Sequence, residues 1–103
     1  MQKRLYFDKN ALRELRKFSE AVQIEFEALF TILKEKGRLE YPEPKKIDKK
    51  LFELRVKYKG QYRGFYAYAG KTYIVILCFF RKKTRRTPIR FIKLAKRRLS
   101  QYE

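Results

Sequence analysis

Positively charged side chains are the residues of this sequence whose types and spacing could do chemistry. Arg55 and Arg63 fall in two strand-like segments, and Lys82 and Lys83 follow a third. Guanidinium and ammonium groups gathered at one place bind phosphate and stabilise charge that develops on phosphoryl oxygens. The chain has no histidine, which excludes a His-based acid and base pair, a Ser-His-Asp triad and His-ligated zinc. One reaction that remains compatible is RNA cleavage in which the substrate's own 2′-hydroxyl attacks the adjacent phosphorus.

The overall charge points in the same direction. Lys and Arg number 28 against 11 Asp and Glu, a formal net charge of +17 on 103 residues. Such a charge opposes compaction unless a polyanion or an acidic partner covers part of it, and nucleic acid is the first candidate. The alternative explanation of the charge is a ribosomal or nucleoid packing protein, or simply a very soluble surface. Because 45% of the residues are hydrophobic, we expect one core and a single domain over residues 1–103.

The single cysteine, the apolar stretches and the lack of cofactor-binding motifs bear on where the protein acts and on which cofactors it could use. The lone Cys78 lies in an apolar run and is predicted to be a small buried side chain. A single cysteine cannot form a disulfide within the chain, which suits a reducing compartment. No stretch reads as a signal peptide or as a bilayer span, so we expect a cytoplasmic protein without membrane contact. The sequence shows no Gly-rich phosphate loop and no two-metal pattern of acids, so we expect no cofactor and no metal.

The elements that must position the cations begin with a short strand over Lys3–Phe7 and a pair of helices. From Asp8 to Lys36 the apolar residues recur at spacings of three and four, which is typical of amphipathic helices. Asp8 is a suitable N-cap for the first helix, and Ser19 can end that helix and cap a second. Gly37 is a good left-handed C-cap for the second helix. The pattern therefore predicts a helical hairpin.

Three strands follow a charged loop over Arg38–Lys50 that contains two prolines. Over residues 51–58 apolar side chains alternate with Glu53, Arg55 and Lys57, which predicts a strand with one charged face. Strands over 61–69 and 72–80, joined by short turns, complete an antiparallel meander. A last helix begins at Thr87-Pro88, with Thr87 as N-cap, and carries its cations on the outer faces: Arg90, Lys93, Lys96, Arg97 and Arg98. The fold class is α+β, in the order β-α-α-β-β-β-α.

If the helical hairpin covers one face of this sheet, the cations converge on the other face. Arg63 lies in a mostly apolar strand and needs an anionic partner, which Glu53 on the preceding strand could supply. The tyrosines of the sheet could stack on unpaired bases or could simply fill the core. The run FFRKKTRRTP, over 79–88, is either a solvated connector or a phosphate site, and we favour the phosphate site. Candidate RNA-binding residues are Lys57, Lys59, Tyr62, Arg81, Thr84, Arg85 and Arg86.

The order of these pieces resembles a HigB-type toxin of the RelE/ParE superfamily. The pieces are ELR at 53–55, QYR at 61–63, a long apolar strand, FRKKTRRTP at 80–88 and a terminal AKRRL helix, and the resemblance covers essentially the whole chain. It implies a bacterial or phage toxin, an endoribonuclease that cleaves mRNA on the ribosome. It also implies a cognate antitoxin, often a HigA-like helix-turn-helix protein, with or without a larger toxin-antitoxin assembly.

The resemblance also implies site residues. Arg55, Arg63 and Lys83 fall at the basic catalytic positions, with Lys82 as the alternative to Lys83. Arg63 would bind the scissile phosphate, and Lys83 would stabilise the transition state or the leaving oxygen. Two positions depart from the pattern, because Glu53 and Phe91 stand near where some relatives carry a catalytic lysine and tyrosine; Tyr102 is a distant substitute. Two other functions stay open: poisoning of DNA gyrase, and passive binding of RNA or the ribosome.

Overall fold

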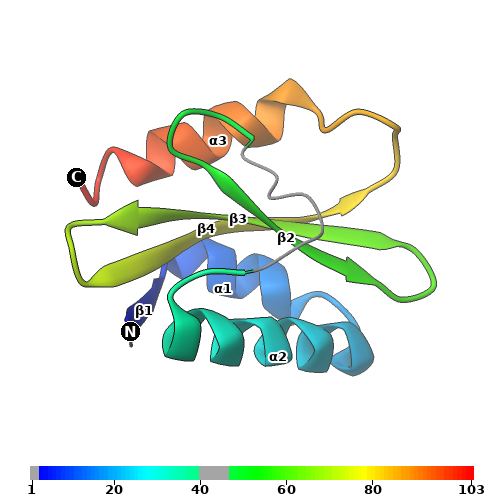
Figure 1. Ribbon diagram of the computed structural model, residues 1–103. Coiled ribbons are helices and arrows are strands. Elements are labelled where there is room, and N and C mark those ends of the chain that lie inside the picture. Colours follow the sequence, from blue (N-terminus) through cyan, green and yellow to red (C-terminus); the bar gives the residue numbers. More distant parts are fainter. Residues whose placement is uncertain (1–2, 40–46) are drawn as a thin grey trace.

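The computed structural model describes residues 3–39 and 47–103, which form a four-stranded sheet with helices on both faces (Figure 1). The elements in chain order are β1 (Arg4–Phe7), α1 (Lys9–Arg16), α2 (Glu20–Lys36), β2 (Phe52–Lys57), β3 (Gln61–Ala69), β4 (Tyr73–Lys82) and α3 (Ile89–Leu99). The predicted α+β class and the predicted order of elements are confirmed.

Both N-terminal helices begin at the predicted N-caps, and α2 ends at the predicted Gly37, but α1 ends at Arg16 with Lys17 as its C-cap rather than at Ser19. The Asp8 carboxylate caps α1 by accepting a hydrogen bond from the backbone N–H of Asn10 at 2.8 Å. Ser19 Oγ caps α2 by accepting from the backbone N–H of Val22 at 3.3 Å. Gly37 ends α2 with a φ of 75°, a conformation in which a side chain would be strained.

The strands lie in the order β1-β4-β3-β2. The predicted antiparallel meander of β2, β3 and β4 is confirmed, and β1 adds to the other edge of β4 as a parallel strand. A parallel neighbour requires a crossover connection, which here includes α1, α2 and the first two strands of the meander. The register sets Arg55 directly opposite Arg63 and sets Gln61 opposite Lys82.

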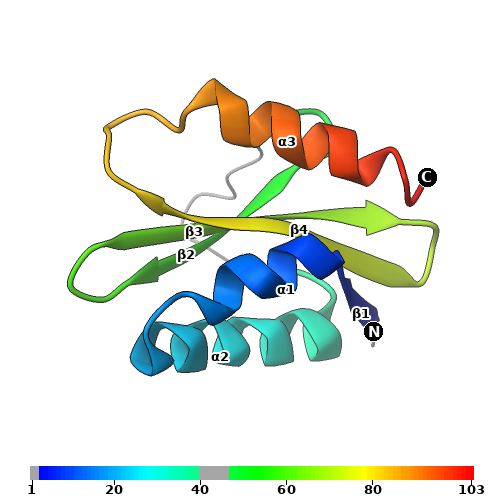
Figure 2. The same cartoon turned by 180° about the vertical axis from the view of Figure 1, so that it is seen from behind.

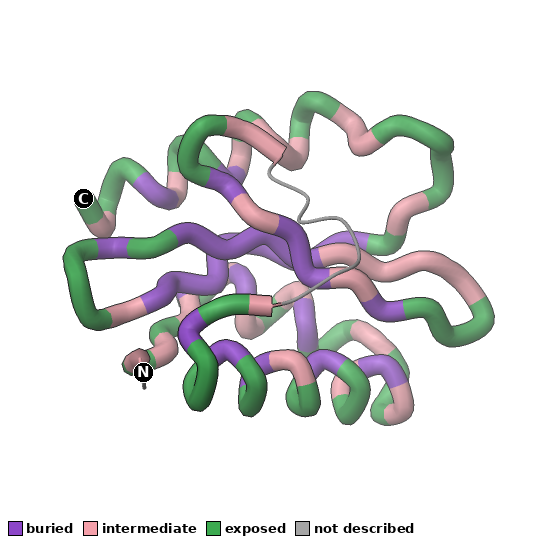
Figure 3. The backbone as a smooth tube through the Cα atoms, in the orientation of Figure 1, coloured by how far each residue is buried: buried purple, intermediate pink, exposed green. Residues whose placement is uncertain are grey.

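The sheet separates two apolar cores. Helices α1 and α2 cover one face, and α3 lies across part of the other face (Figures 1 and 2). Strand β4 is buried almost from end to end, with Ile74 and Ile76 in the core beneath the hairpin and with Val75 and Leu77 in the core beneath α3. Figure 3 shows this buried centre and the exposed connector between β4 and α3.

Three boundary predictions need correction or qualification. Strand β4 continues to Lys82, two residues beyond the predicted end. The prediction of Thr87 as N-cap is wrong, because Pro88 adopts the extended N-cap conformation (ψ 133°) and α3 begins one residue later, without a side-chain cap. Most of the predicted proline-containing loop, residues 40–46, lies outside the described residues. Within the described ranges no helix combines the length and the apolar character needed to cross a bilayer.

Candidate functional site

Two arginines face each other on the side of the sheet away from the hairpin. Leu54 and Val56 of β2 point into the core beneath α1 and α2, so the intervening Arg55 points to the other side. Arg63 lies directly opposite Arg55 on β3. The Arg63 side chain is 11% exposed and the Arg55 side chain 32%, so both are partly withdrawn from water while the pair still reaches the surface.

The buried carboxylate of Glu53 contacts both arginines. Its side chain is 2% exposed, and its Oε1 accepts a hydrogen bond of 2.6 Å from Arg55 Nε and lies 3.6 Å from Arg63 Nε. The predicted ion pair between Glu53 and Arg63 is confirmed. Arg63 Nη1 also donates to Gln61 Oε1 at 3.2 Å and to the backbone oxygen of Tyr62 at 3.0 Å. The Arg63 guanidinium is thus oriented by two hydrogen bonds from Nη1, and its Nε lies within ion-pair distance of Glu53 without a hydrogen bond to it.

Lys82 of β4 points to the same side of the sheet as the two arginines. Phe80, which pairs with Arg63, belongs to the core beneath α3, and Lys82 follows two residues later on the same side of the strand. Directly opposed side chains on neighbouring strands stand about 5 Å apart at Cβ, and diagonal ones about 7–8 Å. Arg55, Arg63 and Lys82 therefore form one surface, which we call the cationic face.

Lys83 lies beyond the end of β4, in a hollow beside the cationic face. The hollow has a volume of about 320 Å³ and is lined by Arg81, Lys83, Thr84, Pro88, Arg90 and Phe91. Phe91 of this hollow stacks on Phe80, the residue that pairs with Arg63, with ring centroids 4.0 Å apart. The Arg90 guanidinium lies 4.7 Å from the Phe91 centroid. The structure therefore groups Lys82 with the two arginines and sets Lys83 next to them.

The expectation that tyrosine rings share a surface with the arginines is wrong for Tyr62. Its ring packs edge-on against Phe18 at 4.9 Å, on the hairpin side of the sheet, because neighbouring strand residues point to opposite faces. Tyr66 is buried in the same core, and Tyr68 Oη donates to the Gly37 backbone oxygen at 2.8 Å. Tyr62 and Tyr66 thus pack in the core on the hairpin side, and Tyr68 is 37% exposed beside the end of α2, so none of the three lines the cationic face.

The remaining predicted RNA contacts do not all share the cationic face, because Arg81 pairs with Tyr62 and its guanidinium lies 5.6 Å from the centroid of that ring, on the hairpin side of the sheet. Lys57 ends β2 on its charged face, and Lys59 occupies the next turn with a positive φ of 51°. Arg81 Nη2 donates to the Lys59 backbone oxygen at 3.3 Å, which ties the turn to β4. Arg85 and Arg86 are exposed in the connector, where Thr84 Oγ1 donates to the Arg86 backbone oxygen at 2.6 Å.

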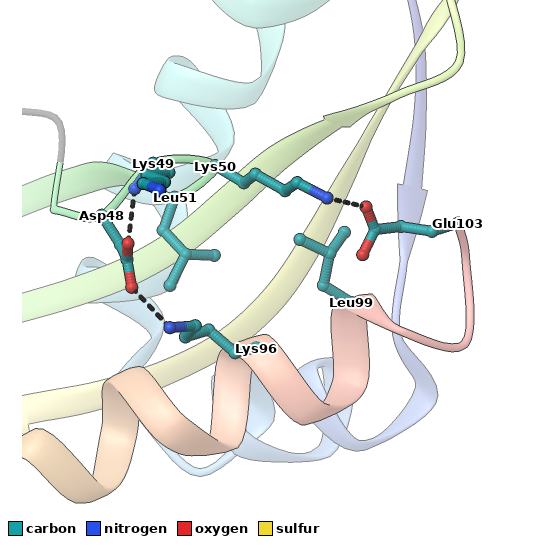
Figure 4. A pocket seen from close by; sticks show the side chains of 7 residues that line it. All are labelled: Asp48, Lys49, Lys50, Leu51, Lys96, Leu99 and Glu103. Carbon is teal, nitrogen blue, oxygen red and sulfur yellow. Dashed lines mark hydrogen bonds and ion pairs between the residues drawn. The ribbon is translucent and has the colours of Figure 1, made fainter.

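A second hollow lies at the other end of α3. Two ion pairs cross it, Lys96 with Asp48 at 2.9 Å and Lys50 with Glu103, above a floor of Leu51 and Leu99 (Figure 4). The hydrogen bond from Lys96 is the main reason that the pKa of Asp48 lies below its usual value. This second hollow has a volume of about 220 Å³ and contains none of the predicted site residues. In the described part of the chain, no three acidic or cysteine side chains gather as a metal site would require.

Sequence reasoning missed the buried role of Arg98. It was expected on the outer face of α3, but its side chain is 12% exposed and pairs with Glu14 of α1 at 2.8 Å. Tyr102 Oη donates to Asp8 Oδ2 at 2.9 Å in the same cluster, so this hydroxyl lies away from the cationic face. No local signal marks such a contact, because the paired residues are far apart in the sequence.

This arrangement of sheet and helices is the fold of the toxin RelE. A mutant of E. coli toxin RelE in the free state superposes with a TM-score of 0.70 and 16% identity over 100% of both chains. A second structure, the same mutant with an antitoxin RelBc peptide, gives 0.65 and 21% identity over 92% of this chain and 95% of that one. Residues 13–100 match the profile of the family described as Phage derived protein Gp49-like (DUF891), and the chain belongs to that family. None of the curated proteins matches the sequence.

Proposed function

We propose that this chain is the toxin of a type II toxin-antitoxin system, of the HigB type, and acts as a single-domain endoribonuclease on mRNA at the ribosome. The observation that supports this most is the cationic face, where two arginines stand opposite each other and a lysine lies on the next strand. The RelE fold and the Gp49-like family are consistent with the same function.

The proposed chemistry uses the substrate's own nucleophile. The 2′-hydroxyl gives up its proton to water and its oxygen attacks the adjacent phosphorus, the bond from phosphorus to the 5′-oxygen of the next nucleotide breaks, that oxygen takes a proton from water, and a 2′,3′-cyclic phosphate forms. Arg63, the more buried of the two arginines, binds the scissile phosphate. Arg55 and Lys82 stabilise the negative charge that grows on the phosphoryl oxygens. Holding the reacting atoms in line supplies much of the remaining rate acceleration.

Lys83 takes a supporting part in this proposal. It lies in the hollow beside Phe91 rather than on the ladder that carries Arg63. We therefore assign the charge-stabilising role to Lys82 and give Lys83 a contact to the leaving oxygen or to the next phosphate. The exposed cations of the connector, Arg85 and Arg86, contact the RNA backbone or the ribosome.

The proposed partners follow from charge and fold. A protein of net charge +17 gains solubility and stability from an acidic antitoxin, and the RelE complex contains an antitoxin peptide. We propose an antitoxin with a HigA-like helix-turn-helix domain. The site of action is the cytoplasm, where mRNA and ribosomes are found.

Brief expression of the chain in bacteria, with mapping of mRNA 5′ ends, tests this function. We expect growth arrest and new 5′ ends that follow the reading frame, because a ribosome-bound nuclease cuts in phase with codons. DNA breaks with unchanged mRNA ends would instead identify a gyrase poison. The absence of any arrest would identify a passive RNA-binding protein, and either result would reject the proposal.

A further inference from the structure

Glu53 is the one acidic side chain that the structure puts within ion-pair distance of the arginines of the cationic face, among the residues that the structure describes. It is almost completely buried, at 2% side-chain exposure, in a chain with a large excess of positive charge. Burying a carboxylate is costly unless it is paired and hydrogen-bonded. Its place between two guanidinium groups meets that requirement, so the position of Glu53 depends on both arginines.

The arginines depend on Glu53 in turn. Arg55 and Arg63 are directly opposed on neighbouring strands, and like charges in that arrangement repel each other. Glu53 lies two residues from Arg55 on the same face of β2, and its Oε1 lies near the Nε atom of each arginine, at 2.6 Å and 3.6 Å. A carboxylate placed near both guanidinium groups lowers the repulsion between them.

We propose that Glu53 is a positioning residue, which fixes the arginine pair in the geometry that receives a phosphate group of RNA. This inference rests on the proposed function and adds a residue to it. We expect no direct contact of Glu53 with the substrate, because its side chain is only 2% exposed. Arg55 is hydrogen-bonded to Glu53 through Nε and Arg63 is drawn to the same oxygen as an ion pair. A long arginine side chain restrained in this way has lost much of its rotamer freedom before the ligand arrives, so less is lost on binding and the phosphate is held in one orientation.

The proposal separates RNA binding from RNA cleavage. Removing a negative charge from a cationic surface strengthens its attraction to phosphate, whereas loss of orientation slows the reaction. For Glu53→Gln we therefore expect RNA affinity equal to or higher than that of the unmodified protein, with cleavage of ribosome-bound mRNA slowed by about tenfold or more. A residue with a merely structural role would lower both in proportion to the unfolded fraction.

The matched control is Glu27→Gln, which removes the same charge from an exposed position of α2, on the far side of the sheet. We expect its cleavage rate to equal that of the unmodified protein. Glu53→Asp is the second variant, because it keeps the charge while withdrawing the carboxylate by one methylene group. We expect it to cleave at a rate between those of Glu53→Gln and the unmodified protein, and it decides the proposal if Glu53→Gln does not fold.

The side-chain Nε–H signals of Arg55 and Arg63 in NMR spectra give a readout that does not require activity. We expect both to be sharp and protected from exchange in the unmodified protein, and to broaden or move in Glu53→Gln but not in Glu27→Gln. Unchanged arginine signals in Glu53→Gln, or changed signals with full cleavage, would overturn the positioning role. If the unmodified chain cleaves no RNA, the proposed function fails. The shifts that inorganic phosphate induces in the two signals then show whether Glu53 still prepares the pair for an anion: equal shifts with and without Glu53 would overturn the inference.

Discussion

Arg98 of α3 donates two side-by-side hydrogen bonds to Glu14 of α1, from Nη1 to Oε1 at 3.0 Å and from Nη2 to Oε2 at 2.8 Å. Arg98 Nη1 also donates to the Leu77 backbone oxygen at 2.8 Å, and Glu14 Oε1 accepts from the Phe79 backbone N–H at 3.1 Å. This cluster joins the first helix, the central strand and the last helix. The hydrogen bonds to Glu14 are the main reason that the pKa of Arg98 is raised.

Replacing Arg98 with methionine should destabilise the protein by about 2 kcal/mol, because it removes both guanidinium donors from the Glu14 carboxylate and the side-chain donor from the Leu77 carbonyl. The methionine retains most of the apolar stem, so the loss reports the polar contacts. Urea denaturation followed by circular dichroism measures the free energy of unfolding. Arg97→Met, one residue away and exposed, is the control, with an expected change within about 0.5 kcal/mol. Equal effects of the two substitutions would show that the cluster adds no stability.

Cys78 should resist alkylation in the folded protein. It is fully buried, and burial raises the pKa of its thiol to about 12. The thiolate is the reactive form, and in the unfolded chain it appears near pH 8.5. The native state therefore holds its proton over a range in which the unfolded state has lost it, and stability falls as the pH rises from about 9 toward 12. Iodoacetamide labelling at pH 8.5 measures how accessible and reactive the Cys78 thiol is. We expect slow labelling in the folded protein and faster labelling when urea is added. Rapid labelling without urea would contradict the buried position.

The connector cations should contribute to RNA affinity through phosphate contacts. For a single strand, each neutralised phosphate contributes about −0.7 to the slope of log affinity against log salt. Arg85→Ala should therefore make the slope less steep by about 0.7 and weaken binding equally for different RNA sequences. Fluorescence anisotropy with a labelled oligonucleotide over a range of salt concentrations measures the slope. Arg13→Ala removes an exposed charge from α1, on the opposite side, and should leave the slope unchanged. The same slope in both variants would remove the connector from the RNA surface.

Much of the fold is readable from local patterns. Asp8, Ser19 and Gly37 mark the helix ends because capping depends on the backbone of a few neighbouring residues. The meander follows from alternation and short turns. The parallel addition of β1 to β4 depends on tertiary packing, as does the extension of β4 to Lys82, where pairing with Gln61 continues the ladder.

The candidate site was readable in part. Alternation predicts that Arg55 faces away from the core, and the pairing of Arg63 with Glu53 follows from the cost of burying an unpaired charge. The same alternation places Tyr62 and Arg63, which are neighbours on β3, on opposite faces of the sheet. The pairing of Arg98 with Glu14 could not be inferred, since α3 could present several of its cations to the core and only the three-dimensional packing selects one.

The cationic face is tested most directly by the rate at which purified protein cleaves mRNA in a reconstituted translation reaction. We expect Arg63→Ala and Lys82→Ala each to lower this rate by about a hundredfold, the usual effect of removing one transition-state donor, and Lys83→Ala to lower it by about tenfold. Circular dichroism confirms folding, and Arg13→Ala again controls for charge. Cleavage by folded Arg63→Ala at the rate of the unmodified protein would contradict the account.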